Sequence, residues 1–394
     1  MKKILVLMGI TIFALALVAC TSTPKLYVLN WGEYINEDLV AQFEAENGVR
    51  VILSLADSNE AMEQRVKENT TAYDIVIPSD YMIEKLWDED YLQAIDLTKL
   101  ENFDQTAFVP GLNGIMDMMF QDNPEVTDAY TVSIPYFWGV FGIMYNRSLA
   151  GLEEYITTNS WGSVFEQEPA GLFSRALKVG MYDVPRFAYS ASLIYADSKA
   201  EYVDVDAAAL NTFSTSLLDT SEDILSQRSY HSWATDMLKK DIEAGNLDFA
   251  FLYVGDFFDT YLILTENAET PEEAALLASH IGIHIPSTTI AFYDGMIIPA
   301  VARNVDLAHK FIDFFLDPDI AYENSGIVGY TTVLTETADM IKNATKGDLI
   351  RSVMVSAYPY NPSTIQNFTA IPLIAFSNEN TDTIASMINT VKSK

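Results

Sequence analysis

After residue 24, apolar positions along the chain alternate between a two-residue period and a helical period, which predicts strands separated by helices. The first predicted helix has Leu39, Val40 and Phe43 on one of its faces. Asn36 can cap its start and Gly48 can end it. In order, the predicted elements are a strand at 26–30, a helix at 36–48, a strand at 49–55, a helix at 57–69, a strand at 74–77 and a helix at 81–90.

Strands that alternate with helices form a parallel sheet covered on both faces, and ligands bind beyond the carboxyl ends of its strands. The polar and aromatic residues at 31–34 and 79–81 directly follow two predicted strands. The pattern therefore predicts a ligand crevice at this edge. The helix at 57–69 is expected to begin at Asp57, with Glu60 three positions later as in a capping box.

The rest of the chain continues the mixed pattern. The apolar stretch 134–144, with Pro135 near its start, could carry the chain from the first sheet into another. A helix is predicted from Asp306 to the Asp317-Pro318 pair, and the last 60 residues are predicted to be mostly helical. Further strands are predicted at 249–254, 280–285 and 291–299, and a further helix at 233–243.

The N-terminal residues have the pattern of a targeting segment. Lys2 and Lys3 precede an apolar stretch at 4–18, which is short for a membrane-spanning helix. The stretch ends in Leu-Val-Ala-Cys, which resembles a bacterial lipobox cleaved before Cys20. We expect residues 1–20 to be a lipoprotein signal peptide, Cys20 to carry the lipid, and 21–24 to be a tether. The alternative is a free thiol in an uncleaved anchor; either way the rest of the chain lies outside the cytoplasm.

Composition narrows the class of ligand. The 394 residues are 49% hydrophobic, which supports a large core, and carry a net charge of −32. This acidic charge argues against nucleic acid as a partner, because phosphates require a basic surface. The charge fits a cationic ligand, although an acidic, soluble surface would also account for it.

Motifs for catalysis or metal binding are missing from the sequence. His280 and His284 lie in a predicted strand and lack further ligands, so no metal site is predicted. The sequence has no GxSxG elbow, P-loop or GxGxxG motif, and its one cysteine is assigned to the lipid. We therefore expect no enzyme and no cofactor, although a pair of catalytic carboxylates among the 55 acids stays an open alternative.

In four short segments, aromatic residues lie next to carboxylates at or near the ends of predicted strands. An alkyl diamine requires this combination, because carboxylates pair its ammonium groups and rings cover its methylenes and attract the cations. For each cluster alone, a surface acid beside a packed ring is the alternative. The clusters are Trp31-Gly-Glu33-Tyr34, Ser79-Asp80-Tyr81, Tyr253-Val-Gly-Asp256 and Phe292-Tyr293-Asp294.

The segments LYVLNWGEYI, YDIVIPSDYMIEKL, SIPYFWGVFGIMYN and FYDGMIIPAVARNVDLAHKFIDFF occur in an order that resembles the spermidine/putrescine-binding proteins of bacterial ABC importers. The similarity covers about residues 25–335 and is weak at 150–230. It implies a two-lobe α/β periplasmic-binding-protein fold, type II-like, with the ligand in a cleft between discontinuous lobes. The lobes would be 25–138 with 293–334, and 139–292 with 335–394. The protein would be a monomer that serves an ABC permease.

The resemblance also implies the ligand contacts. Glu33, Asp183 and Asp294 would neutralise ammonium groups, and Ser79 would form a hydrogen bond. Further candidates are Asp80, Arg186, Asp256 and Tyr293. The carbon chain would be enclosed by Trp31, Tyr34, Tyr81, Tyr253, Phe292 and Tyr330.

At one position the sequence departs from the pattern of this family, and the difference bears on which amine the protein binds. Three residues after Asp183, where spermidine-binding members have Glu, this chain has Arg186. A cation there would repel an ammonium group, so the sequence favours putrescine over spermidine. The alternatives are another solute on the same fold, such as an amino sugar or a cationic drug-like molecule, a polyamine sensor that signals to a membrane partner, or an extracytoplasmic hydrolase.

Overall fold

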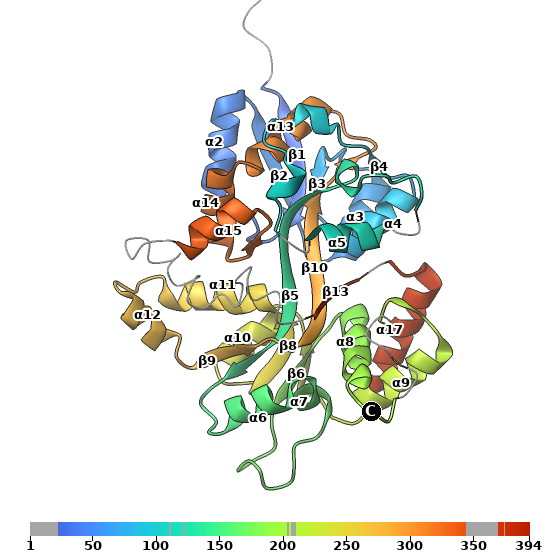
Figure 1. The fold of residues 1–394 in the computed structure, drawn as a ribbon, viewed down its shortest axis with the longest axis vertical. Helices are drawn as coiled ribbons and strands as arrows, with labels where there is room; N and C mark the ends of the chain where they lie inside the picture. The colour runs from blue at the N-terminus through green and yellow to red at the C-terminus, as the bar shows by residue number, and fades with distance from the viewer. Residues whose placement is uncertain are drawn as a thin grey trace, which may run out of the picture.

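The computed structural model describes residues 23–109, 112–120, 123–202, 205, 210–343, 369–373 and 375–394. The predicted signal peptide, the lipid site at Cys20 and residues 21–22 of the tether lie outside these ranges. The chain forms two α/β lobes, one above the other in Figure 1, and the long strands β5 (Ile134–Asn146) and β10 (Thr288–Met296) run through both. No helix among the described residues has the length and apolar character needed to cross a bilayer.

A three-stranded parallel sheet forms the centre of the upper lobe, as the pattern predicted. Its order is β2-β1-β3, with β1 at Lys25–Trp31, β2 at Arg50–Ala56 and β3 at Ile75–Val76. The helices that follow these strands are α2 (Glu37–Asn47), α3 (Asn59–Glu68) and α4 (Asp80–Asp88). Helix α2 is capped as expected: Asn36 Oδ1 accepts from the backbone N–H of Asp38 (3.0 Å), and Gly48 ends the helix at φ 63°.

Three predicted helix starts were wrong. Ser58, not Asp57, caps α3, because its Oγ accepts from the backbone N–H of Ala61 (3.1 Å). Asn304, not Asp306, precedes helix α13 (Val305–Phe315), so Asp306 lies in the first turn. The predicted helix at 233–243 begins only at Met237, because Ser232–Ala234 form strand β7 and pair with the neighbouring strand.

The larger sheet joins the two lobes. Its order is β13-β10-β5-β8-β6-β7, and β9 and β12 also pair with β5. Strands β5 and β10 are antiparallel, and their register shifts between Asp294 and Gly295. The remaining strands of this sheet are β6 (Val179–Tyr182), β7 (Ser232–Ala234), β8 (Phe249–Tyr253), β9 (Ile281–His284), β12 (Thr331–Thr332) and β13 (Thr369–Pro372), and β4 (Leu92–Gln93) pairs separately with β11 (Ile298–Pro299).

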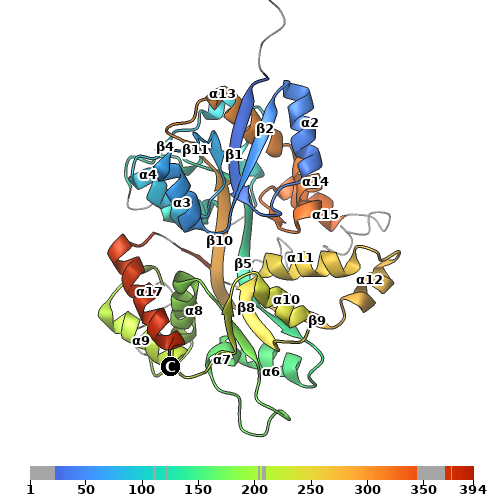
Figure 2. The same cartoon turned by 180° about the vertical axis from the view of Figure 1, so that it is seen from behind.

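Helices surround both sheets. The upper lobe also carries α5 (Leu112–Met119), α13, α14 (Pro318–Val328) and α15 (Thr335–Lys342). The lower lobe carries α6 (Leu152–Asn159), α7 (Trp161–Phe165), α8 (Pro185–Asp197), α9 (Thr215–Leu225), α10 (Met237–Glu243), α11 (Val254–Thr265), α12 (Pro271–Leu277) and α17 (Asn378–Lys392), as Figure 1 and Figure 2 show from opposite sides.

The placement of α15 bears on the lobe boundary. This helix packs against α14 and β12 in the upper lobe, whereas the predicted boundary after residue 334 assigned it to the lower lobe. We propose that the upper lobe comprises 25–138 with 293–343, and that the chain changes lobe along β5, along β10 and after α15.

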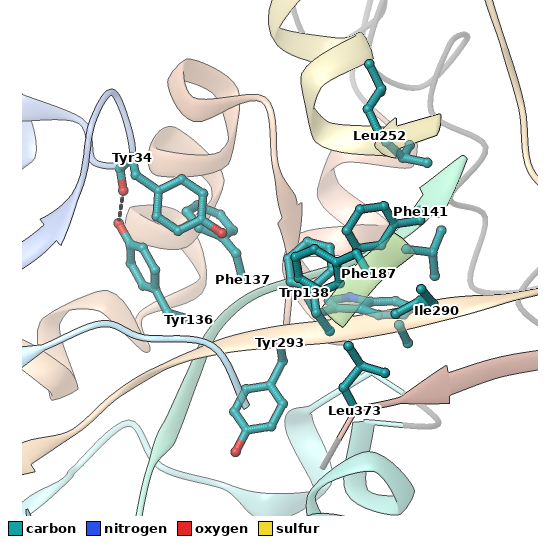
Figure 3. Packing of buried hydrophobic residues seen from close by; sticks show 14 of the residues in the cluster. Tyr34, Tyr136, Phe137, Trp138, Phe141, Phe187, Leu252, Ile290, Tyr293 and Leu373 are labelled. Atoms are coloured by element: carbon teal, nitrogen blue, oxygen red, sulfur yellow. Dashed lines mark hydrogen bonds between the residues drawn. The ribbon is translucent and has the colours of Figure 1, made fainter. Parts of the chain in front are cut away.

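Strand β5 is buried along nearly its whole length, which explains its continuous apolar run. Its rings pack into the core that passes from one lobe to the other, where Phe137, Trp138 and Phe141 lie beside β10 (Figure 3). The Trp138 indole donates to the carbonyl oxygen of Thr332 (3.0 Å), so this buried N–H is satisfied.

Candidate functional site

A cleft of about 720 Å³ lies between the lobes, at the carboxyl end of β1. Side chains from both lobes line it, including every residue for which the resemblance implied a direct contact. The structure therefore brings together Trp31, Glu33, Tyr34, Ser79, Tyr81, Asp183, Tyr253, Phe292, Asp294 and Tyr330, and Asp256 joins them.

Asp294 lies at the upper-lobe side of the cleft and is only 5% exposed. The Tyr34 hydroxyl donates to its Oδ2 (2.6 Å), and the Ser79 hydroxyl donates to its Oδ1 (2.7 Å). Burial raises the pKa of Asp294 to about 6, and the two hydroxyl donors offset only part of that cost. No lysine or arginine among the described residues pairs with it. A buried carboxylate with neutral donors alone is suited to receive a cation from a ligand.

Asn59 holds the neighbouring polar groups in place. Its Nδ2 donates to Ser79 Oγ (3.1 Å) and to the Tyr81 hydroxyl oxygen (3.0 Å), and its Oδ1 accepts from the Ser79 N–H (2.9 Å). Asn59 also lines the cleft, and the sequence reasoning missed it. Its place in the first turn of α3, which follows a strand of the predicted crevice, was the available signal.

Aromatic rings form the walls of the cleft. Tyr253 and Phe292 meet edge to face at 4.7 Å between ring centroids, and Tyr34 and Tyr330 do so at 5.0 Å. Tyr330 packs directly on the backbone of Gly255, where an added Cβ would lie 2.2 Å from its Cζ. The sequence reasoning missed two further lining rings, Tyr182 and Phe187, which flank Asp183 in the chain.

The Tyr34 ring lies among other rings that support it. Tyr136 and Phe137 pack edge-on against Tyr34, with centroid distances of 5.8 Å and 5.1 Å. Figure 3 shows the Tyr136 hydroxyl donating to the backbone carbonyl oxygen of Tyr34 (2.9 Å). This packing fixes the hydroxyl that binds Asp294.

Two carboxylates of the lower-lobe wall, Asp183 and Asp256, have cationic partners within the chain. Lys392, near the end of α17, forms an ion pair with Asp183, and its Nζ lies 5.1 Å from the centre of the Trp233 ring. Lys239 of α10 lies 3.5 Å from an oxygen of Asp256. Burial raises the pKa of Asp256 to about 6, and Lys239 opposes that shift.

Trp31 and Glu33 lie at the turn after β1. The indole Nε1 of Trp31 is buried and has no hydrogen-bond partner among the described residues. Glu33 adopts the left-handed conformation (φ 54°), and its side chain is exposed at the cleft. The turn therefore presents a hydrated carboxylate that a charged ligand can reach, and pairing would remove water from both groups.

Asp80, Arg186 and Tyr293 do not line the cleft. Tyr293 points to the opposite face of β10 from Phe292 and Asp294, as strand alternation requires, and its hydroxyl contacts Ser133 Oγ (2.9 Å). Asp80 is buried, and its Oδ1 accepts from the Tyr81 N–H (2.8 Å). Desolvation and the nearby charges of Asp294 and Glu84 raise its pKa well above the usual value.

Arg186 does not line the cleft, although the sequence predicted that it would repel an ammonium group near Asp183. Its guanidinium stacks on Phe376, with Cζ 3.5 Å from the ring centroid, and Nη2 donates to Asn211 Oδ1 (2.9 Å). Burial lowers its pKa to about 9. The cation beside Asp183 is instead Lys392. Among the described residues, no group of three or more His, Cys, Asp or Glu side chains is arranged to hold a metal ion.

Comparison with known proteins gives consistent matches. The family described as bacterial extracellular solute-binding protein matches residues 38–349. The putrescine-binding periplasmic protein SpuD of Pseudomonas aeruginosa is 27% identical over 329 residues, which cover 82% of each chain. A putrescine/cadaverine-binding protein of the same species is 27% identical over 351 residues, 87% of this chain and 88% of that protein.

Solved structures share the fold. A putative spermidine/putrescine ABC transporter protein from Listeria monocytogenes superposes with a TM-score of 0.69 at 26% identity, covering 94% of this chain and 99% of that chain. The TpPotD lipoprotein of Treponema pallidum superposes with a TM-score of 0.70 at 22% identity, covering 94% of this chain and 100% of that one. At that identity the second match establishes the fold alone.

Proposed function

The chain belongs to the bacterial extracellular solute-binding proteins, and from that premise we propose that it captures a linear polyamine and delivers it to an ABC permease. Relatives that match over most of its length are named for binding putrescine, cadaverine or spermidine. Members of this family bind solutes for transport, so no chemical step is required of the cleft.

The observation that carries the proposal is the buried carboxylate of Asp294 in an aromatic cleft. An ammonium group that reached it would pair with the charge, while the hydroxyls of Tyr34 and Ser79 keep the carboxylate oriented. Tyr253 and Phe292 would cover the methylenes that follow. Glu33, exposed at the rim, would contribute to the negative potential that draws a cation in.

We propose that putrescine is preferred over spermidine. The pairing of Asp183 with Lys392 supports this, because it removes one carboxylate that a third ammonium group would need. A triamine would have to displace Lys392 or leave an ammonium group unpaired, and both cost binding free energy. This reason replaces the predicted repulsion by Arg186, whose guanidinium lies on Phe376.

The N-terminal pattern supports attachment by a lipid. Lys2 and Lys3, the apolar stretch and the Leu-Val-Ala-Cys ending fit a signal peptide cleaved before Cys20. We propose that the mature protein is a monomeric lipoprotein, held at the outer face of a membrane beside its permease.

The test is to identify what the protein binds. Mass spectrometry of small molecules released from the denatured purified protein should find a linear amine. Isothermal titration calorimetry of ligand-free protein should then give tighter binding for putrescine than for spermidine. Absence of any amine from the released fraction, together with no binding heat from either amine, would refute the proposal. Tighter binding of spermidine would refute only the preference.

A further inference from the structure

Helices α10 and α11 bring one lysine and three aspartates together at the lower-lobe wall of the cleft. Lys239 Nζ lies 2.5 Å from Asp259 Oδ2 and 3.5 Å from Asp256 Oδ1. Asp236, one residue before α10, adds a third nearby negative charge. We call Asp236, Asp256 and Asp259 the lower acidic cluster; all three line the cleft, as Lys239 does.

Lys239 is held as a bound ammonium ligand would be held. Its side chain is only 15% exposed, and that of Asp256 is 10% exposed. Burial disfavours the charged ammonium, yet the surrounding aspartates more than offset this and raise the pKa of Lys239. The ammonium therefore stays charged and cancels one of the cluster's three negative charges.

The two sides of the cleft differ in this respect. Asp294, at the upper-lobe wall, receives hydrogen bonds from two neutral hydroxyls. The lower acidic cluster has an ammonium of the chain's own in contact with two of its carboxylates. A ligand ammonium can pair with Asp294 without displacing a cation, but one that approaches Asp256 or Asp259 meets Lys239.

We propose that Lys239 is a specificity-determining residue that acts as a resident ammonium and sets how many positive charges the ligand can bring into the cleft. The inference rests on the proposed binding of amines and extends it. With Lys239 in place, the lower acidic cluster has negative charge left for one end of a short diamine. An additional ammonium group that approached Asp256 or Asp259 would have to compete with Lys239, which contacts both carboxylates.

A purely structural role is the competing explanation, because Lys239 also ties α10 to α11. Substitution by methionine keeps most of the apolar stem and removes the charge, whereas arginine keeps the charge. A structural tie would change stability and affinity for every amine alike. A resident ammonium would change the dependence of affinity on ligand charge.

The experiment is calorimetric titration of the full chain with butylamine, putrescine, spermidine and spermine, which carry one to four ammonium groups. In Lys239→Met, the ratio of the spermidine Kd to the putrescine Kd should fall by at least about tenfold, which is about 1.4 kcal/mol. Lys239→Arg should keep the wild-type ratio. Lys240→Met is the matched control, because Lys240 also lines the cleft, is exposed, and changes the net charge equally. It should move the ratio by less than about threefold.

Each other outcome counts against the inference. An unchanged ratio in Lys239→Met overturns it, as does an equal change in Lys240→Met, which would indicate a general charge effect. Lys239→Gln provides a second neutral variant, and circular dichroism confirms that each variant is folded. If the wild-type protein binds none of the four amines, the proposed function fails and the inference falls with it. If it binds putrescine and the ratio does not move, only the inference fails.

Discussion

At the scale of single residues, the cleft depends most on Asp294, a buried carboxylate with two neutral donors. Asp294→Asn keeps the size and an oxygen acceptor but removes the charge that would pair with an ammonium. We expect the Kd for putrescine to rise by at least about 100-fold, because losing one partner of a buried charge pair costs roughly 3–5 kcal/mol. Isothermal titration calorimetry measures this change in Kd.

Asp80→Asn is the control, since Asp80 is buried near Asp294 but does not line the cleft. The putrescine Kd of this variant should stay close to the wild-type value. Equal losses in both variants would contradict the assignment.

The same carboxylate predicts a pH dependence. The pKa values of Asp294 and Asp256 are both raised by burial to about 6, above the ordinary value of 3.8. Between about pH 4 and 6 the folded, empty protein therefore binds more protons than the unfolded chain, and these groups make it less stable as pH rises through that window. The affinity for the ligand should instead increase as pH rises, because an ammonium group pairs with ionised Asp294.

Two measurements check these signs. The putrescine Kd should fall as pH rises from about 5 to about 7.5. Over the same range, ionisation of Asp294 and Asp256 should not raise the melting temperature of the empty protein. In Asp294→Asn the empty protein should lose part of this pH dependence of stability. Affinity that is constant over this range would contradict the role of a carboxylate with a raised pKa.

At the scale of elements, local sequence predicted the strands and helices that position the upper-lobe side of the site, but not α8 and α11 of the lower lobe. Asn36 and Gly48 bound α2 as expected, and the residues after β1 and β3 lie at the cleft, because strand ends in a parallel sheet share one edge. Alternation along β10 also places Phe292 and Asp294 on one face.

The predictions failed where the outcome depends on distant residues. Trp233 lies in strand β7 because this segment pairs with β6, and the local periodicity of the sequence does not indicate that pairing. Lys392 pairs with Asp183 although 209 positions separate them in the sequence. Arg186 does not line the cleft, and its guanidinium packs on the ring of Phe376. Lining residues such as Trp31, Ser79 and Phe292 could thus be predicted from the pattern of strands. Asp183 and Tyr330 followed from the family resemblance alone, and the charge partners could not be predicted.

The start of α11 gives a prediction at this scale. Gly255 lies in the first turn, where an alanine would ordinarily favour a helix, but Tyr330 occupies the space a Cβ would need. We expect Gly255→Ala to weaken putrescine binding by at least about fivefold, since overpacking typically costs about 1–3 kcal/mol and here it would push apart two residues of opposite lobes. In the Tyr330→Ala background the same substitution should cost little, so calorimetry on the four proteins of this double-mutant cycle should give a large coupling energy. Additive effects would show that the contact with Tyr330 does not matter.

At the scale of the whole molecule, the lobes meet on both sides of the cleft. Tyr330 packs on Gly255 near α11 and α14. On the other side, Glu84 Oε2 of α4 accepts from the backbone N–H of Ala375 (2.6 Å), and Lys85 Nζ donates to Asn378 Oδ1 (2.8 Å). Helix α4 belongs to the upper lobe, whereas α17, which begins at Asn378, belongs to the lower lobe. Because β5 and β10 run through both lobes, they are the segments about which hinge motion would occur.

These contacts predict that closure and affinity are coupled at a distance from the ligand. Lys85 does not line the cleft, so Lys85→Ala leaves the proposed ligand contacts intact while removing a contact that favours the closed lobes. We expect the empty variant to have a larger radius of gyration in small-angle X-ray scattering and a putrescine Kd raised by about three- to tenfold, because a ligand that binds the closed form must also supply the free energy of closing. Saturating putrescine should return the radius of gyration to the value of the liganded wild-type protein.

Lys67→Ala is the control, because Lys85 also pairs with Glu63 within the upper lobe and Lys67 is another partner of Glu63. This control should leave the radius of gyration and the putrescine Kd near their wild-type values. If Lys85→Ala matched this control in scattering and affinity, the contact between α4 and α17 would have no part in closure, and the contacts at Tyr330 would have to account for it alone.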